Sequence, residues 1–179
     1  MIRKSIARTY ARALIKSAST DAELKDFRNQ LKEVSDIISS SPDLEEMLSK
    51  PILSVEKRRS LLDNIISRIN CHRIVSNLCM AMLANYRLNH LGSVIQIIDE
   101  EIDRKEGIIR GEFITANKVD ESLIRKAEAE LSKILNRKII LSPVIQKEII
   151  GGAIIRIGSV EIDGSILRRI NSIENINIF

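Results

Sequence analysis

The sequence predicts an α plus α/β fold, in which an N-terminal six-helix bundle over residues 1–105 precedes a small C-terminal α/β domain over residues 106–179. The first observation is that apolar residues recur at intervals of three and four up to about residue 105, as on amphipathic helices joined by short connections. The second is that this period changes to two at Glu106-Gly107, as in strands. The C-terminal domain is therefore predicted to hold three or four strands and two helices.

The composition allows a packed core but does not select a partner. Hydrophobic residues make up 44% of the 179 positions, whereas aromatic residues make up only 3%, so Ile, Leu, Val and Ala must fill the core. The net charge of +4 suits nucleic acid, an anionic membrane surface or an acidic protein equally well. No apolar run is long enough to cross a bilayer, and the N-terminus lacks the apolar region of a secretion signal, so we expect a bacterial cytoplasmic location.

The first predicted helix, residues 2–18, has an apolar face and a basic face. The apolar face mixes small and large residues, at Ile2, Ile6, Ala7, Tyr10, Ala11, Leu14 and Ala18. Basic residues repeat every four positions on the opposite side, at Lys4, Arg8, Arg12 and Lys16. This basic stripe is either a solvated helix face, which is the usual case, or a docking surface for an acidic partner.

Three further helices are predicted from capping signals. Thr20 and Glu23 form a capping box before an apolar series that ends ahead of Pro42. Pro42 suits the first position of a short third helix, which ends before Pro51. Ser54 is expected to cap a fourth helix with a broad apolar face.

A fifth helix, from about Cys71 to Tyr86, and a sixth complete the predicted bundle. Four carboxylates lie close together on the sixth helix, at Asp99, Glu100, Glu101 and Asp103. Such a group can bind a metal or act in acid–base chemistry, but on consecutive helical turns it is more often a solvated face. Cys71 and Cys79 are expected to be small buried hydrophobes, because their spacing fits neither a zinc site nor a disulfide framework.

The C-terminal domain is predicted to begin with an alternating strand over residues 108–115 and a helix capped by Asp120. A second strand, residues 138–145, is predicted to be interrupted by Pro143, which cannot donate a ladder hydrogen bond.

The most informative stretch is residues 149–165. Gly151 and Gly152 stand before an alternating run, where a glycine pair usually marks a bulge or a close backbone approach. A turn, a second alternating run and a last helix are predicted to follow, with the helical spacing Ile166, Ile170 and Ile173.

No catalytic motif is found in the sequence. A phosphate-binding loop needs the spacing GxxxxGK[ST], and the run that begins at Gly151 has neither that Lys nor the Rossmann glycine spacing. No Ser, Cys or Thr stands in a nucleophile elbow, and the two histidines, His72 and His90, are isolated. We therefore expect no catalysis by this chain, no cofactor and no metal centre.

Five segments resemble one known family, in the order of the chain. They are residues 7–14, similar to an ARRYAKAL opening; residues 48–57; residues 84–91, similar to ENxRLxxL; residues 113–119, similar to VTSAxxL; and residues 149–165, where an IGG strand precedes DGS. Together they resemble the delta subunit of F-type ATP synthases, called the oligomycin-sensitivity-conferring protein in mitochondria. The chain departs from the family pattern at Ala84, at His90 and at Gln146-Lys147, which stands where Asp-Pro is usual.

The resemblance implies a non-catalytic peripheral-stalk subunit at the cytoplasmic face of the bacterial inner membrane. In that family the helical domain binds N-terminal segments of alpha subunits and the C-terminal domain joins b subunits. The family implies the first and fifth helices for the alpha segment, and spacing alone selects the candidate linings Ile6, Tyr10, Ala11, Leu14, Leu78 and Met82. The candidate b-binding residues are Ile154, Arg156, Asp163 and Ser165. Residues expected to be structural are Asn85, Arg87, Leu88, Gly151 and Gly152.

An RNA-binding module of the antitermination type is the alternative function, because helical bundles with basic faces bind RNA. Sequence-specific recognition of single strands generally uses stacking aromatic side chains, and the predicted strands offer only Phe113. The 24 acidic residues lie among 28 basic ones, which argues against one continuous track for phosphates. RNA binding is therefore the less favoured prediction.

Overall fold

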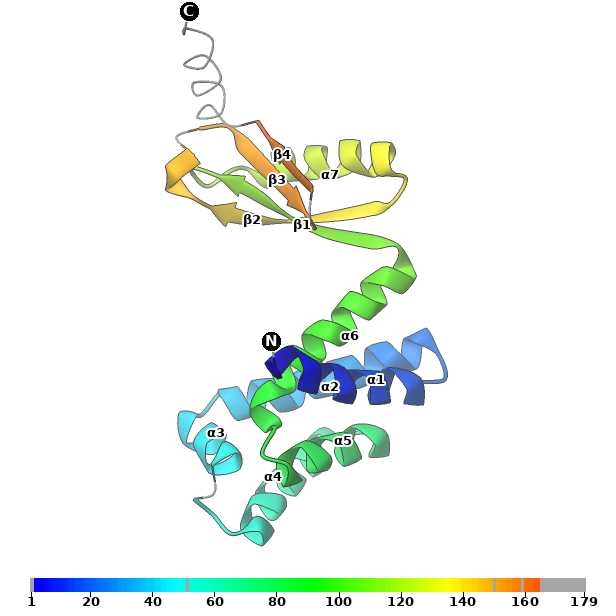
Figure 1. Ribbon diagram of the computed structural model, residues 1–179, viewed down its shortest axis with the longest axis vertical. Coiled ribbons are helices and arrows are strands. Elements are labelled where there is room, and N and C mark those ends of the chain that lie inside the picture. Colours follow the sequence, from blue (N-terminus) through cyan, green and yellow to red (C-terminus); the bar gives the residue numbers. More distant parts are fainter. Residues whose placement is uncertain (1, 51, 150, 159, 165–179) are drawn as a thin grey trace, which may run out of the picture. The chain divides into compact units, whose positions relative to one another are not determined.

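The computed structural model describes residues 2–50, 52–149, 151–158 and 160–164, without the side chains of residues 2–4. The chain divides into two compact units, the first ending at Ile102 and the second beginning at Asp103. Figure 1 shows helices in the first unit and the sheet in the second. The prediction of helices followed by a mixed helix-and-strand domain is thus confirmed, while the grouping of six helices as one bundle stays a prediction.

The described part of the first unit is helical, with short turns between the helices. The elements are α1 (Ile2–Ser17), α2 (Asp21–Ser39), α3 (Pro42–Ser49), α4 (Val55–Ile69), α5 (Arg73–Ala84), the short 3₁₀ helix η1 (Leu88–His90) and α6 (Leu91–Glu106). The last residues of α6 belong to the second unit.

Local side-chain chemistry fixes where these helices begin and end. Thr20 Oγ1 accepts a hydrogen bond from the N–H of Glu23 at 3.1 Å, and the Glu23 carboxylate accepts one from the N–H of Ser19 at 2.6 Å. This is the predicted capping box with one difference, because the Glu23 carboxylate accepts from Ser19 and not from the N-cap residue Thr20. Helix α5 is shorter than predicted, because His72 is its N-cap and Tyr86 leaves the helix with a φ of 55°. Three further predicted helix starts are confirmed, at Pro42, Ser54 and Asp120.

The core of the first unit is mostly aliphatic and joins side chains from all six α-helices. Phe27 is the largest of its fully buried side chains. Ala7 and Ala11 of α1 are both 0% exposed, so their small side chains let α1 approach its neighbours closely. Each large side chain buried in this way stabilises the unit by about 1.5–3 kcal/mol relative to exposure.

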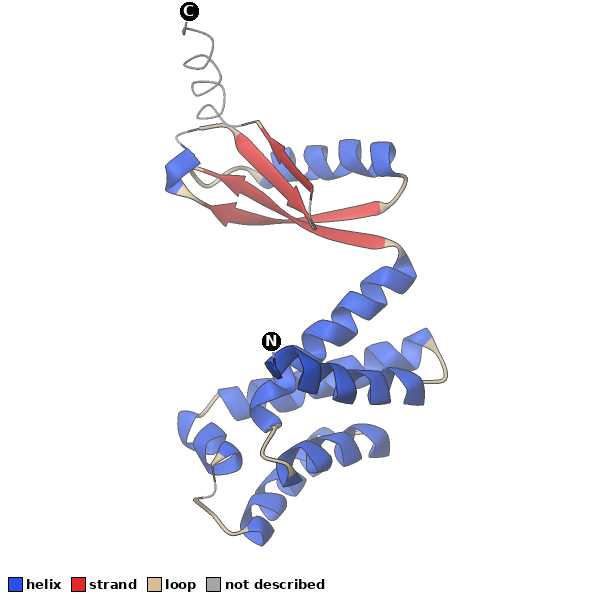
Figure 2. Ribbon diagram, in the orientation of Figure 1, coloured by secondary structure: helices blue, strands red, loops and turns tan. Residues whose placement is uncertain are grey.

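The second unit contains one mixed sheet and one helix among the residues described. The elements are β1 (Ile108–Thr115), α7 (Glu121–Leu135), β2 (Lys138–Ile145), the short 3₁₀ helix η2 (Lys147–Ile149), β3 (Ala153–Ile157) and β4 (Val160–Asp163). The strand order is β2-β1-β3-β4, with β1 and β2 parallel and the other two pairs antiparallel. Figure 2 shows α7, the crossover between the parallel strands, beside the sheet. The core here gathers Phe113, Ile124, Leu131, Ile139 and Leu141.

Pro143 does not interrupt β2, contrary to prediction. The strand runs unbroken through it, and Pro143 lies opposite Phe113 in the register with β1. Because β2 is at the edge of the sheet formed by the described residues, the missing N–H of Pro143 can face away from the ladder. The sequence pattern alone does not distinguish an edge strand from a central one.

Glycine allows a close backbone approach at Gly111, in the middle of β1. A Cβ atom at this position would lie 2.7 Å from the carbonyl oxygen of Arg156 and 2.8 Å from Cγ1 of Ile157. Gly152, in the predicted glycine pair, has a φ of 85°, which L-residues rarely adopt. Ser165 and the predicted last helix with Ile166, Ile170 and Ile173 lie outside the described residues.

Candidate partner-binding surfaces

The predicted lining between α1 and α5 is mostly core in this structure. The two helices pack against each other, and Ala11, Leu14 and Met82 are 0% exposed, with Leu78 at 8%. These four side chains contact other parts of the same chain and do not form an open surface. Ile6 and Tyr10 remain half-buried and accessible. An accessible surface on α1 therefore contains only two of the six candidates.

The basic stripe of α1 is solvent-facing where the structure describes it. Arg8, Arg12 and Lys16 are all exposed. Together with the accessible parts of Ile6 and Tyr10, they give α1 an apolar edge beside a positively charged face, an arrangement that a negatively charged amphipathic segment fits.

The segment after α5 holds the turn into η1 and α6. The amide Nδ2 of Asn85 donates a hydrogen bond to the carbonyl oxygen of Ala81 at 2.7 Å, and the backbone N–H of Arg87 donates one to that of Met82 at 2.8 Å. Leu88 is only 5% exposed and joins the core. These contacts lie within the chain, while a structural role for the side chains of Asn85, Arg87 and Leu88 stays a prediction.

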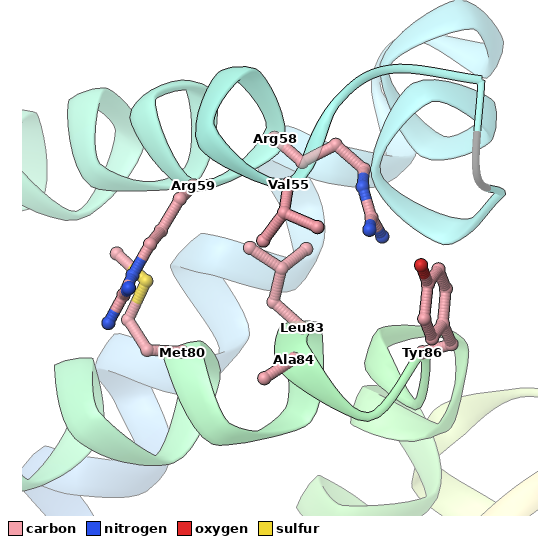
Figure 3. Close-up of a pocket in the computed structure, with 7 residues that line it drawn as sticks. All are labelled: Val55, Arg58, Arg59, Met80, Leu83, Ala84 and Tyr86. Carbon is pink, nitrogen blue, oxygen red and sulfur yellow. The ribbon is translucent and has the colours of Figure 1, made fainter.

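A cavity of about 160 Å³ lies between the start of α4 and the end of α5, and sequence reasoning missed it. Val55, Arg58, Arg59, Met80, Leu83, Ala84 and Tyr86 line it. In Figure 3, Arg58 points toward the Tyr86 ring, Arg59 lies near Met80, and Val55 and Leu83 face each other between them. The cavity is therefore apolar in its middle and cationic at both ends.

Arg58 is the most unusual residue of this cavity. It is only 2% exposed, and its Nε and Nη1 have no hydrogen-bond partner within the described part of the chain. Its guanidinium carbon lies 4.4 Å from the centroid of the Tyr86 ring. A cation–π contact of this kind contributes up to about 2 kcal/mol. A buried donor left unpaired costs about 1–3 kcal/mol, and more when the group is charged, so the contact does not replace the missing hydrogen bonds.

One sequence signal does point to Arg58. It lies four residues before Leu62 and seven before Ile65, so it occupies a position on the buried face of α4. A charged residue at a core-facing position is a reason to look for a site.

The candidates on the sheet lie on β3 and β4. Arg156 Nη1 lies 3.0 Å from Glu112 Oε2, and its Nε lies 2.9 Å from Glu161 Oε2. These three residues are register partners across β1, β3 and β4. The hydrogen bond to Glu161 and the charge of Glu161 are the largest causes that raise the pKa of Arg156. Ile154 and Asp163, the other two described candidates, are half-buried register partners.

The described carboxylates of α6 are solvated or paired rather than clustered on a metal. Asp99 binds Arg28 of α2, at 2.6 Å from Nε and 3.0 Å from Nη2, and Asp103 binds Arg110. Among the residues described, no three His, Cys, Asp or Glu side chains are grouped so that they could hold a metal ion.

The two cysteines lack the features of reactive thiols. Burial raises the pKa of Cys79 to about 12, and the neighbouring Cys71 adds to the shift. Burial, and then the charge of Glu33, raise the pKa of Cys71 as well. Both thiols are therefore held in the protonated, weakly nucleophilic form at neutral pH.

Within the described ranges, the helices are too short or too polar to span a membrane.

Comparisons with known proteins agree over nearly the whole chain. The sequence model of the ATP synthase delta (OSCP) subunit family matches residues 6–176. ATP synthase subunit delta of Anaeromyxobacter dehalogenans is 31% identical over 166 residues, which cover 93% of either chain. That of Oleidesulfovibrio alaskensis is 31% identical over 162 residues, or 89% of this chain and 88% of the relative. A chain of the Toxoplasma gondii mitochondrial ATP synthase hexamer has the same fold, with a TM-score of 0.67 at 18% identity over 95% of this chain and 96% of that one. The chain belongs to the ATP synthase delta (OSCP) subunit family.

Proposed function

We propose that this chain is a non-catalytic peripheral-stalk subunit of a proton-translocating F-type ATP synthase. In this role it links the catalytic head to the membrane sector and holds the head against rotation. The observation that carries the proposal is the family match over residues 6–176, which includes both units. A rotary motor delivers work only if its head is held still, so such a subunit needs two docking surfaces and no active site.

The alpha-subunit contact is proposed for α1. The accessible parts of Ile6 and Tyr10, beside the exposed Arg8 and Arg12, support it, since an amphipathic segment can lay its apolar face on the first pair and its acidic groups on the second. In this proposal the buried side chains of Ala11, Leu14, Leu78 and Met82 act indirectly, because their packing holds α1 and α5 in position.

The b-subunit contact is proposed for the second unit, around β3 and β4. The exposed apolar side chains Val160 and Ile162, at 60% and 49% exposure, support this surface. Both lie on β4, at the edge of the described sheet, where a partner can also add backbone hydrogen bonds. We also propose that the subunit works without a cofactor and that it is a peripheral protein at the cytoplasmic face of the inner membrane.

The alpha contact can be tested by calorimetry on the full chain with the N-terminal segment of the alpha subunit. Ile6→Lys places a charge where the apolar face of the segment would lie, and we expect the affinity to fall about tenfold or more. The matched control is Ile52→Lys, because Ile52 is 59% exposed and lies outside α1. Equal affinities for both variants and the original chain would remove α1 from the proposed contact.

The comparisons give no support to the RNA-binding alternative. A titration with structured RNA over a salt series tests it directly, because phosphate-driven binding falls steeply as salt rises. We expect no saturable RNA binding at about 150 mM salt, the physiological ionic strength.

A further inference from the structure

The cavity at Arg58 lies outside the α1 surface and the sheet, and its chemistry is incomplete. Two guanidinium nitrogens of Arg58 are buried without a hydrogen-bond partner in the described residues, and Arg58 lines one end of an apolar cavity. Leaving a buried cation without an anion costs free energy, and a bound anion would recover part of that cost. The cation–π contact with Tyr86 orients the guanidinium but accepts none of its hydrogen bonds.

Helix α4 itself offers no anion to Arg58. The residues three and four positions away on the helix or its cap are Ser54, Val55, Leu61 and Leu62, none of which is acidic. Arg59 differs, because Glu56 precedes it by three residues, Asp63 follows it by four, and both line a neighbouring hollow together with Arg59. Of the two arginines that line this cavity, Arg58 is therefore the one whose negatively charged partner must come from outside α4.

We infer that this cavity binds a carboxylate carried on a small apolar group. The planar guanidinium of Arg58 matches a carboxylate, which can accept two parallel N–H bonds. Val55, Met80, Leu83 and Ala84 would contact the apolar part of the ligand. A cavity of 160 Å³ is close to the size that accommodates a group of about six heavy atoms.

A phosphate fits this cavity less well than a carboxylate does. Four of the seven lining residues carry purely hydrocarbon or thioether side chains. Arg58 can bind two oxygens of a phosphate through parallel N–H bonds, and the apolar walls would leave the other oxygens and the second charge desolvated. A carboxylate exposes a single charge and two oxygens, and its hydrocarbon part gains from the same walls.

The carboxylate can belong to an acidic side chain of a protein segment with an apolar neighbour, or to a free small carboxylic acid. In both cases the recognised chemistry is the same, and the site does not depend on the proposed alpha contact at α1. Arg58 is 2% exposed and the Tyr86 ring that covers it is 48% exposed, so an acid from either source reaches the guanidinium by displacing this ring.

The test follows the side-chain Nε–H signal of Arg58 by NMR in the full chain, assigned by its loss in Arg58→Met. Isovalerate is the free-acid probe and isovaleramide its uncharged match. The peptide probe is acetyl-Leu-Glu-Leu-amide, matched with the same peptide carrying Gln in place of Glu.

We expect a saturable shift of the Arg58 signal with at least one acid, and an affinity about tenfold higher for that acid than for its uncharged match. Saturation by isovalerate alone identifies a small-acid site, and saturation by the Glu peptide alone identifies a protein side chain. The inference is wrong if neither acid gives a saturable shift, or if the amide and Gln probes bind equally well.

Variants separate binding from folding. Arg59→Met removes the neighbouring charge and should keep acid binding, followed through the backbone signals around the cavity, whereas Arg58→Met should lose it. Ala84→Leu fills the cavity while leaving Arg58 in place, and it should also lose binding. Each variant is first checked for a cooperative thermal unfolding transition, which shows that it is folded. Acid binding that persists in a folded Arg58→Met variant would overturn the inference.

Discussion

In the first unit, six helices bury mostly aliphatic side chains in one continuous core. In the described part of the second unit, a core cluster of five buried side chains lies between α7 and a four-stranded sheet. Stability in the first unit depends mainly on how completely side-chain volume is filled. In the second it depends also on backbone register, as the close approach at Gly111 shows. The comparison predicts that the two units respond to different kinds of substitution.

Removing volume from the helical core should have the largest effect. Leu31 is 0% exposed on α2, so Leu31→Ala loses buried hydrocarbon and leaves a cavity, which should lower the free energy of unfolding by about 2–5 kcal/mol. Denaturant unfolding followed by circular dichroism measures this. The matched control is Leu123→Ala on α7, where the side chain is 48% exposed and the loss should be much smaller.

Adding one methyl group to the sheet should have the next largest effect. Gly111→Ala forces a Cβ against the Arg156 carbonyl oxygen, and we expect a loss of about 1–3 kcal/mol. Gly92→Ala on α6 adds the same methyl group where no atom lies within 4 Å, and should instead stabilise by up to about 1 kcal/mol. If both substitutions had the same effect, backbone packing at Gly111 would not be limiting.

The buried thiol of Cys79 predicts how stability changes at high pH. Its pKa is raised to about 12 in the folded chain, above the ordinary thiol value of 9.0. The unfolded chain therefore releases this proton first, so the stabilisation is complete below pH 9.0 and is lost as pH rises toward 12. Cys79→Ser should show a weaker fall in unfolding free energy over this range. An identical pH dependence in both proteins would contradict the burial of this thiol.

Removing the ion-pair cluster of the sheet should have the smallest effect on stability. Arg156→Gln breaks contacts with Glu112 and Glu161 that are open to solvent, and exposed pairs contribute little. We expect a nearly unchanged thermal midpoint and weaker binding of soluble b subunit in calorimetry. A large loss of stability, with b binding unchanged, would make Arg156 a purely structural residue.

Most of the fold could be predicted because its signals are local. The apolar spacing and the caps at Thr20, Ser54 and Asp120 each act within one or two helical turns, and they placed the helices correctly. The strand order could not be predicted, because pairing joins residues far apart in sequence. Pro143 illustrates this, since its meaning changes once β2 is known to be an edge strand.

The candidate site was harder to predict than the fold. Ala11, Leu14, Leu78 and Met82 have the spacing of a helical contact face, and the structure uses that face for packing within the chain. An apolar helix face has the same spacing whether it packs inside the chain or binds a partner, so spacing cannot distinguish these two cases. Arg58 was missed for a related reason, because its unpaired state depends on side chains brought together from α4 and the end of α5.

The most direct test of the proposed peripheral-stalk role uses membranes in which the ATP synthase has lost both this subunit and the catalytic head. The purified head is added back with or without this chain, and ATP-driven proton pumping is measured together with ATP hydrolysis. The proposed role predicts that pumping returns only when the chain is present, while the hydrolysis rate of the free head does not change. Full pumping without the chain, or none with it, would contradict the proposed mechanical role.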